Sequence, residues 1–585
     1  MAQTAQTAQT RTAPAGTAGG ENSGGRHPGD RILRDATRHS AARTVALALL
    51  AVTATGATLL LPAALGHTLD LLLARRGAEA TRWVLLCAGL VCAPAALDAL
   101  EDVLSGTTAA RTTAWLRHRL LAHVLAVGPR ATARFAPGDL VTRLVGNAAD
   151  VGTAPGTLAG SVASVAAPLG GVVALGLIDP WLAVGFLAGA PLLALLLRAF
   201  ARASGDCAAE YQRLQGEIAG RLVEAVGGAR TIAAAGTARR ETARVLAPLP
   251  GLSHQGHRMW RVQGRAAAQA VTVVPLLQIT VLAVAGLRLT QGALSVGDLL
   301  AASRYAVLAT GVGVLVGHLG AIVRARTAAG RIAEVLAEPA TAHGYCRLPA
   351  GPGTLALRGV SAERGGRTVL RDVDLVVPGG TSLAVVGRSG TGKSVLAELA
   401  GRLADPAAGV VTLDGVPLRE LGHDTLRRAI GYAFARPAPL GGSIGGTIAF
   451  GAFDPGPDAV TEAARAACAD GFVRRLPLGY ATPCEAAPLS GGESQRLGLA
   501  RAFAHAGRVL ILDDATSSLD TLTEHEVTRA LHGTTTRTRV VVAHRASTAA
   551  RADRVAWLAD GRLHATGTHE DLWRDPEYRA LFGAR

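Results

Sequence analysis

The chain has 585 residues, of which 49% are hydrophobic and 18% carry a charged side chain. Soluble proteins carry about 25% charged residues, so this composition excludes a wholly disordered chain and indicates that much of the protein faces lipid. The six cysteines are too sparse for a disulfide-stapled secreted domain, and none belongs to a CxxC pair of the kind that holds structural zinc. The formal net charge of +15 permits a nucleic-acid partner, but the positions of the basic residues favour another explanation.

Residues 1–42 repeat Ala-Gln-Thr and continue through Gly, Ser, Pro and Arg without an apolar run. This composition predicts a disordered cytoplasmic tail and not a signal peptide.

Residues 43–335 hold six apolar runs and are predicted to form a transmembrane domain of six helices. A bilayer core needs roughly 20 apolar residues for each helix, and the runs approach that length. Buried helices of a large soluble protein would give similar runs, but six in succession favour a membrane domain. The runs are Thr44–Leu69, Trp83–Leu97, Gly156–Ile178, Trp181–Leu197, Ala266–Leu287 and Leu299–Val323, the last interrupted by Arg304.

The loop charges predict the orientation of these helices. Arg198–Arg265, between the fourth and fifth runs, contains eleven arginines and five acidic residues. The positive-inside rule places this loop and both termini in the cytoplasm, in a multi-pass protein of the plasma or inner membrane surrounded by lipid. Because the spans and loops account for the charge, we expect no nucleic-acid partner.

Three acidic residues, Asp98, Glu101 and Asp102, follow the second run on one helical face. Charges at membrane depth usually line a cavity, so one interpretation is contact with a cationic or polar cargo. The other is an acidic face that is solvated near the cytoplasmic leaflet.

Residues 340–585 alternate short β-like runs, such as Ser382–Val386 and Val509–Leu512, with helical stretches. This alternation predicts a soluble α/β domain with a mostly parallel sheet. The fold class is therefore an all-α six-helix transmembrane domain followed by an α/β P-loop NTPase domain.

A phosphate-binding motif follows the Ser382–Val386 run. Its glycines let backbone N–H groups surround phosphates, its lysine contacts the β- and γ-phosphates, and its serine hydroxyl is a ligand for Mg²⁺. Of the chain's 59 basic residues, only Lys393 is a lysine, and it falls on this motif. The motif is Gly387, Arg388, Ser389, Gly390, Thr391, Gly392, Lys393 and Ser394.

The Val509–Leu512 run ends in Asp513 and Asp514, of which Asp513 is predicted to hold Mg²⁺ and Asp514 to face the attacking water. In front of it stands Leu489-Ser-Gly-Gly-Glu-Ser-Gln-Arg496, which is a more specific sequence.

With these motifs, nearly the whole chain after residue 42 resembles an ATP-binding cassette half-transporter of the six-helix exporter type. The resemblance implies that the protein binds ATP and Mg²⁺, that His544 is the switch histidine, and that two cassettes enclose two ATP molecules head to tail. Ser490, Gly491 and Gly492 of the signature would then serve the ATP bound by the partner subunit.

Three of four departures from the family pattern fall on the ATP site that this chain's own P-loop builds, and the fourth, Pro483-Cys-Glu-Ala-Ala-Pro488, precedes the signature. Asp514 stands where the family has a catalytic Glu, Ala435 where it has a Gln, and Arg364 where an aromatic residue stacks on adenine. Arg364 could stack on adenine as a cation instead. A carboxylate one methylene shorter lies ~1.5 Å further away, and a misplacement of ~1 Å can cost about 100-fold in rate. The losses predict impaired hydrolysis at this site and favour a heterodimer over a homodimer; the alternative is that Asp514 is an adequate base.

The function expected from these features is ATP-driven export of a small molecule, lipid or peptide by an ATP-hydrolysing translocase. One alternative is an importer of the same helical architecture. Another is an ATP-gated regulatory membrane protein that does not hydrolyse ATP productively. The cargo itself is not identified by the residues.

Overall fold

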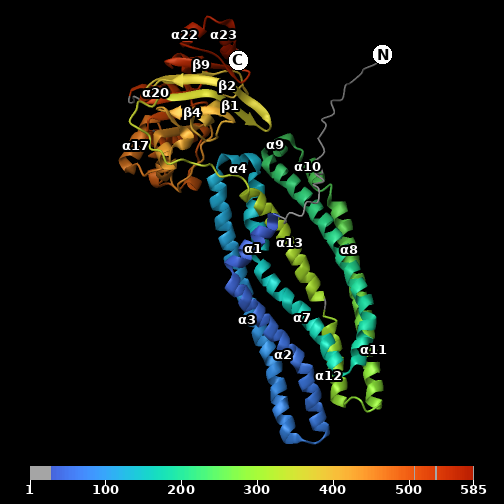
Figure 1. Ribbon diagram of the computed structural model, residues 1–585. Helices are drawn as coiled ribbons and strands as arrows, with labels where there is room; N and C mark the ends of the chain where they lie inside the picture. The colour runs from blue at the N-terminus through green and yellow to red at the C-terminus, as the bar shows by residue number, and fades with distance from the viewer. Residues whose placement is uncertain (1–27, 312, 506, 534–536, 584–585) are drawn as a thin grey trace, which may run out of the picture. The chain divides into compact units, whose positions relative to one another are not determined.

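The computed structural model describes residues 28–311, 313–505, 507–533 and 537–583, which form two compact units (Figure 1). The membrane unit comprises residues 28–125 and 135–338, and the cassette unit comprises residues 126–134 and 339–583.

The membrane unit is entirely helical in its described part. Its elements are α1 (Pro28–His39), α2 (Ala41–Leu73), α3 (Gly77–Val127), α5 (Pro137–Thr142), the π-helical turn η1 (Arg143–Asn147), α6 (Ala148–Gly152), α7 (Ala154–Ile178), α8 (Pro180–Gly227), α9 (Ala229–Ala235), α10 (Ala238–Val245), α11 (Leu249–Thr290), α12 (Val296–Ala309) and α13 (Gly313–Leu336).

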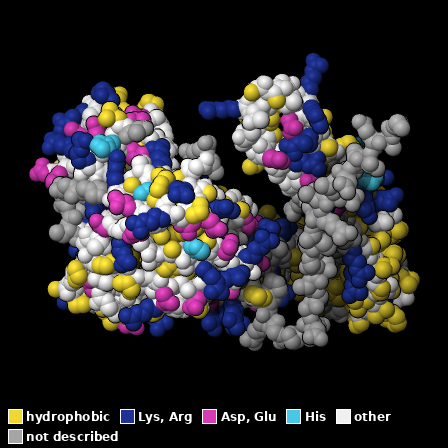
Figure 2. Space-filling model, turned by 90° about the horizontal axis from the view of Figure 1, so that it is seen from above, with side chains coloured by type: hydrophobic (Ala, Val, Ile, Leu, Met, Phe, Trp, Pro, Cys, Tyr) yellow, Lys and Arg dark blue, Asp and Glu magenta, His cyan; other side chains and the backbone are white. Residues whose placement is uncertain are grey.

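Five helical segments among the described residues are long and apolar enough to cross a membrane, and they contain the first five predicted runs. Many of their apolar side chains are exposed, as lipid contact requires; Leu177 on α7 is 83% exposed and Val271 on α11 is 75% exposed. In Figure 2 such side chains gather as yellow patches on the flank of the helices. The sixth predicted run is not one continuous helix, because α12 ends at Ala309 and α13 begins at Gly313. Glycine is disfavoured in the interior of a helix. Gly311 lies between the two helices, and Gly313 is the first residue of α13.

Figure 1 shows the long helices α8 and α11 side by side. The helices α2, α7 and α12 pack against one another, and α12 also packs against α11. At the turn before α12, the Asp70 carboxylate accepts hydrogen bonds from Ser295 Oγ at 2.6 Å and from the Gly297 N–H at 2.8 Å. A Cβ at Gly297 would lie 2.1 Å from the Gly66 carbonyl oxygen, so only glycine permits this approach of α2 and α12.

The prediction of a disordered tail is wrong for residues 28–42. Residues 28–39 form α1, which presents the buried side chains of Ile32 and Ala36, four residues apart, to α13. Asp30 adds an ion pair with Arg326 at 2.7 Å. This short apolar stripe is sufficient to stabilise the helix because α13 covers it. The composition of residues 28–39 does not reveal such a long-range contact. Residues 1–27 of the predicted tail lie outside the described residues.

The cassette unit combines two sheets with helices. An antiparallel sheet has the order β2-β1-β4-β5, and a second sheet has the order β10-β9-β3-β8-β7-β6 with all neighbours parallel except β10 and β9. The mostly parallel sheet was predicted, whereas the antiparallel one was not. The strands are β1 (Leu355–Arg364), β2 (Arg367–Val377), β3 (Ser382–Val386), β4 (Ala408–Leu413), β5 (Val416–Pro417), β6 (Ile430–Phe434), β7 (Val509–Asp513), β8 (Thr538–Val542), β9 (Arg554–Ala559) and β10 (Arg562–Gly567).

The cassette helices cover these sheets, and the buried β3 and β7 lie at the centre of the core. The helices are α4 (Pro129–Arg134), α14 (Lys393–Ala400), η2 (Leu418–Glu420), α15 (His423–Ala429), α16 (Ile444–Ala449), α17 (Gly456–Ala466), α18 (Asp470–Val473), η3 (Gly479–Ala481), η4 (Cys484–Ala486), α19 (Gly491–His505), α20 (Thr521–Gly533), α21 (Ala546–Ala550), α22 (His569–Leu572) and α23 (Pro576–Gly583).

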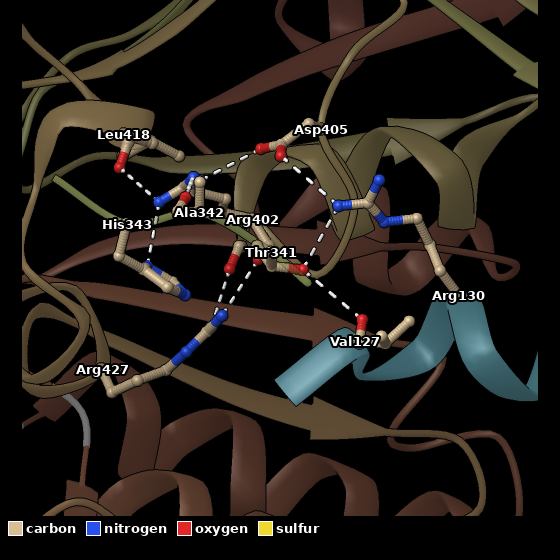
Figure 3. Close-up of polar contacts among 10 residues, drawn as sticks. Val127, Arg130, Thr341, Ala342, His343, Arg402, Asp405, Leu418 and Arg427 are labelled. Atoms are coloured by element: carbon tan, nitrogen blue, oxygen red, sulfur yellow. Dashed lines mark hydrogen bonds and ion pairs between the residues drawn. The ribbon is translucent and has the colours of Figure 1, made fainter. Parts of the chain in front are cut away.

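The buried Arg402 holds residues 339–347, the segment that leads into the cassette sheets, through several hydrogen bonds (Figure 3). Its guanidinium donates to the carbonyl oxygens of Ala342 and Leu418, and it pairs with Asp405 at 3.0 Å. Arg130 of α4 reaches the same cluster, donating to Thr341 Oγ1 at 3.3 Å. Burial, together with the Arg402 charge, lowers the pKa of His343, which keeps this ring a neutral acceptor for Arg402.

We expect Arg402→Met to free residues 339–347 from the cassette. The substitution leaves two carbonyls and a carboxylate without their charged donor, which costs about 2–3 kcal/mol. Trypsin cleavage of the full chain after the exposed Arg347 should therefore be at least ~10-fold faster. The control is Arg419→Met, which removes an exposed arginine from the next turn. Equal cleavage of the two variants would show that Arg402 does not hold this segment.

Candidate functional site

The P-loop connects the end of β3 to the start of α14, and two of its glycines are required by its shape. Gly387 has φ +153° and Gly392 has φ +96°, which disfavour a side chain. A Cβ at Gly392 would also lie 2.7 Å from Leu370 Cδ2. Within the loop, Thr391 Oγ1 donates to the Arg388 carbonyl at 2.9 Å. The loop thus has the tight, glycine-dependent backbone that a phosphate cradle requires, and its contact with phosphates stays a prediction.

Lys393 begins α14 and is only 6% exposed. Its ammonium donates to the carbonyls of Gly387 at 2.9 Å and Arg388 at 3.0 Å, so the loop holds it by neutral acceptors. Burial lowers the pKa of Lys393, and the charges of Asp514 and Asp513 oppose this shift. A desolvated ammonium held by carbonyls gains strongly from the arrival of anionic phosphates.

Ser394 and Asp513, the two predicted Mg²⁺ ligands, are in direct contact. Ser394 Oγ donates to Asp513 Oδ1 at 2.9 Å, and the Tyr432 hydroxyl donates to Asp513 Oδ2 at 3.2 Å. Hydroxyl and carboxylate oxygens are the hard donors that Mg²⁺ prefers, so this pair fits the ion. The sequence did not reveal the role of Tyr432. The contact depends on the pairing of β6 with β7, which places Tyr432 on the strand parallel to the one that ends at Asp513.

Asp514 and His544 face each other across the end of the parallel sheet, with 4.0 Å between Asp514 Oδ1 and His544 Nε2. Both line a hollow of about 180 Å³ with Ser517. Burial raises the pKa of Asp514, an effect that the charges of His544 and Lys393 oppose. Asp514 has φ +53°, a left-handed conformation that Asp adopts more readily than most residues.

The position of the missing glutamine is occupied by Ala435, just after β6. Its carbonyl accepts a hydrogen bond from Gln495 Nε2 at 2.9 Å, and Gln495 Oε1 accepts from the Ser518 N–H at 2.9 Å. Gln495 is 3% exposed and belongs to the signature helix α19. It therefore ties the loop after β6 to the loop after β7, a role that the linear motif does not indicate.

Arg364, the candidate adenine contact, lies at the end of β1 and forms an ion pair with Glu398 of α14. Its side chain is 59% exposed. The guanidinium is therefore positioned at the surface of the same unit as the P-loop, and its contact with adenine stays a prediction.

The signature residues lie at the N-terminus of α19, away from any hydrogen bond to the P-loop among the described residues. Ser490 Oγ and the Ser490 N–H both donate to Glu493 Oε2 at 2.9 Å, which is a helix cap. This backbone hydrogen bond lowers the pKa of Glu493. Ser490 and Gly491 are exposed, and a Cβ at Gly491 would meet no atom within 4 Å. The structure thus leaves this helix end open for a ligand held from elsewhere.

Comparisons with known proteins agree with this architecture. Residues 44–311 match the family model of the ABC transporter transmembrane region, and residues 370–517 match that of the ABC transporter. The chain is 54% identical to the ABC transporter ATP-binding protein RamA of Streptomyces coelicolor, over 92% of this chain and 84% of that protein. It is 37% identical to the multidrug efflux ATP-binding/permease protein Rv0194 of Mycobacterium tuberculosis, over 67% of this chain and 33% of that protein.

Among solved structures, a bacterial Atm1-family ABC exporter with ATP bound has the same fold. The TM-score is 0.76 over 93% of this chain and 98% of that one, at 24% sequence identity, which shows the fold alone. The helical membrane unit and the P-loop cassette define a multi-pass membrane ATPase whose cassette is cytoplasmic. The chain belongs to the ABC transporter family, and its fold is that of the exporters.

Proposed function

We propose that this chain is one subunit of a heterodimeric ATP-driven exporter whose own ATP site hydrolyses poorly. The observation that carries the proposal is the partition of the altered residues. Asp514, Ala435 and Arg364 depart from the family pattern at positions that the resemblance assigns to this chain's own ATP site, whereas Ser490, Gly491 and Gly492 match the family signature. Substitutions at random positions would be expected in the own-site motifs and in the signature alike.

The own site retains the groups that bind nucleotide. Lys393, which the loop carbonyls hold, would contact the phosphates, and Ser394 with Asp513 would hold Mg²⁺, which neutralises phosphate charge when bound. What is altered is the group that faces the attacking water. The shorter Asp514 lies 4.0 Å from His544, and at position 435 a methyl group replaces the glutamine amide. The site therefore favours binding of ATP over its hydrolysis.

The open end of α19 supports a role towards a partner. The N–H groups at the start of α19 and the Ser490 hydroxyl, once it exchanges Glu493 for a phosphate oxygen, would suit a γ-phosphate, where charge develops in the transition state. A partner with an intact catalytic Glu would use this end for productive hydrolysis.

The composition of the complex tests the proposal. Affinity-tagged chain should be extracted from its native membranes, cross-linked and analysed by mass spectrometry. We expect a second half-transporter in about equal amount, with a Glu directly after its Walker B aspartate. A complex made of two copies of this chain alone would contradict the heterodimer.

A further inference from the structure

A cavity of about 340 Å³ lies within the membrane unit, between α3, α7 and α13. Its polar lining comes from all three helices and is not a property of one helical face. The lining includes Glu101, Asp102, Ser105, Thr157, Ser164 and His318.

Two glycines of α7 allow side chains of the neighbouring helices to approach the cavity closely. A Cβ at Gly156 would lie 2.5 Å from Ser105 Oγ, and one at Gly160 would lie 3.0 Å from His318 Cε1. These glycines let α3 and α13 bring their polar side chains close to α7. The cavity is therefore built by the packing of the three helices.

The cavity lies at the depth of the inner leaflet. Glu101 is about 27 Å along α3 from Trp83, where the second apolar run begins, and Gly156 is about 33 Å along α7 from its outer end at Ile178. The hydrocarbon core is about 30 Å thick. The two helices thus agree in placing the cavity near the cytoplasmic boundary of the membrane.

The lining offers hydrogen-bond acceptors and negative charge. Thr157 Oγ1 donates its proton to the Thr153 carbonyl and Ser164 Oγ to the Ser161 carbonyl, so both hydroxyl oxygens keep lone pairs for a donor. His318 Nδ1 is buried and has no hydrogen-bond partner among the described atoms.

Within the part of the chain that the structure describes, the two carboxylates of the cavity form no ion pair. Asp98 and Asp102 act on Glu101 as like charges, and none of the ion pairs among the described residues includes any of the three. Carboxylates of like charge so close together repel one another, so a bound cation would relieve them.

We propose that this cavity binds the protonated amine of a transported molecule, with Glu101 and Asp102 as its counter-ions. The assignment of the amine to a cargo rests on the export function proposed above. An ammonium group carries three donors, which suit the carboxylates, hydroxyl oxygens and imidazole nitrogen of the lining. The volume corresponds to about ten water molecules, enough for an ammonium and part of its carbon body.

An inorganic cation is the other source of positive charge, and the arrangement favours it less. No group of three His, Cys, Asp or Glu side chains within the described residues is arranged to hold a metal ion. Glu101 and Asp102 supply two carboxylates, and no other acidic side chain lines the cavity among the described residues. An organic ammonium can be bound by such a set together with apolar contacts from Val314 and Ala163.

The test uses the purified full chain in nanodiscs and the fluorescent primary amine dansylcadaverine. We expect saturable binding that weakens at least ~10-fold in the Glu101→Gln/Asp102→Asn double variant. Asp98→Asn is the matched control, because Asp98 is exposed on the same helix and does not line the cavity, and its affinity should stay within ~2-fold. Gly160→Ala narrows the cavity from another helix and should also weaken binding.

Further arms separate the possible sources of the signal. N-acetyl-dansylcadaverine, which is neutral, should bind at least ~10-fold more weakly than the amine. Equal binding of the two probes, an unchanged affinity in the double variant, or displacement of the amine by micromolar Mn²⁺ would each overturn the proposal.

ATP binding by the same preparations shows that the variants are folded. Lost amine binding with ATP binding retained is the expected result for the double variant. The export proposal fails separately, if inside-out vesicles containing the assembled complex show no ATP-dependent uptake of dansylcadaverine although the purified chain binds it through the cavity. That outcome would support an amine-binding site in the cavity and would contradict its role as a cargo site.

Discussion

Gly491→Asp is expected to lower ATP turnover by the assembled transporter at least ~100-fold. Under the proposed function, Gly491 begins α19 and its backbone meets the γ-phosphate held by the partner. Loss of one donor at a developing negative charge costs about 100- to 1,000-fold, and an added carboxylate repels the phosphate as well. Turnover of the co-purified complex under saturating ATP is the measurement.

The structure offers a matched control for this substitution. Gly471, in α18 of the same unit, is also exposed, and a Cβ there would meet no atom within 4 Å. Gly471→Asp should therefore leave turnover within ~2-fold of the unaltered complex. If Gly491→Asp complexes hydrolyse ATP as fast as Gly471→Asp complexes, the signature of this chain does not serve the productive site.

Lys393→Ala is expected to weaken ATP binding by the chain about 10- to 100-fold. The substitution removes the one lysine of the chain from the P-loop, and hydrogen bonds to a charged group contribute about 1.5–3 kcal/mol. Arg in its place should bind weakly too, because the planar guanidinium does not fit a cradle shaped around a compact ammonium. Equilibrium binding of a fluorescent ATP analogue to the purified chain measures the loss.

Arg371→Ala serves as the control for Lys393→Ala, because it removes an exposed positive charge from β2 of the same unit. Its ATP affinity should stay within ~2-fold of the unaltered chain. Unchanged affinity in Lys393→Ala would mean that residues 387–394 do not form the nucleotide site.

The local motifs of the cassette could be predicted because each is contained in a short stretch with one characteristic backbone. The P-loop needs a strand, glycines with positive φ and a helix start, and all three are visible around Lys393. The contacts of Tyr432 with Asp513 and of Gln495 with Ala435 could not be predicted in the same way. They depend on which strands are neighbours and on the register of β6 against β7, which are set by tertiary packing.

Long-range partners also explain where the structure departs from the predicted tail and the predicted bounds of the membrane domain. Residues 28–39 have a disordered composition, yet they form a helix because α13 buries Ile32 and Ala36. Residues 126–134 continue from the second span, but Arg130 contacts Thr341 and Asp405, and the segment belongs to the cassette unit. In both cases the deciding contact joins residues about 200 or more positions apart, beyond the reach of local patterns.

The acidic face of α3 shows how a structure can distinguish residues that the sequence pattern treats alike. Glu101 and Asp102 line a cavity with side chains of α7 and α13, whereas Asp98 does not. Spacing alone puts all three residues on one face, and only the packing of the neighbouring helices distinguishes them.

The rate of ATP hydrolysis by the chain purified alone tests the central claim most directly. The chain should be reconstituted in nanodiscs and compared with the co-purified complex under the same conditions. With Asp514 in place of the family's catalytic Glu and Ala435 in place of the glutamine, we expect at most about 1% of the rate of the complex, although ATP still binds. A homodimer of this chain that hydrolyses ATP at a rate comparable to the complex, and loses that activity in Lys393→Ala, would contradict the claim that its own site is impaired.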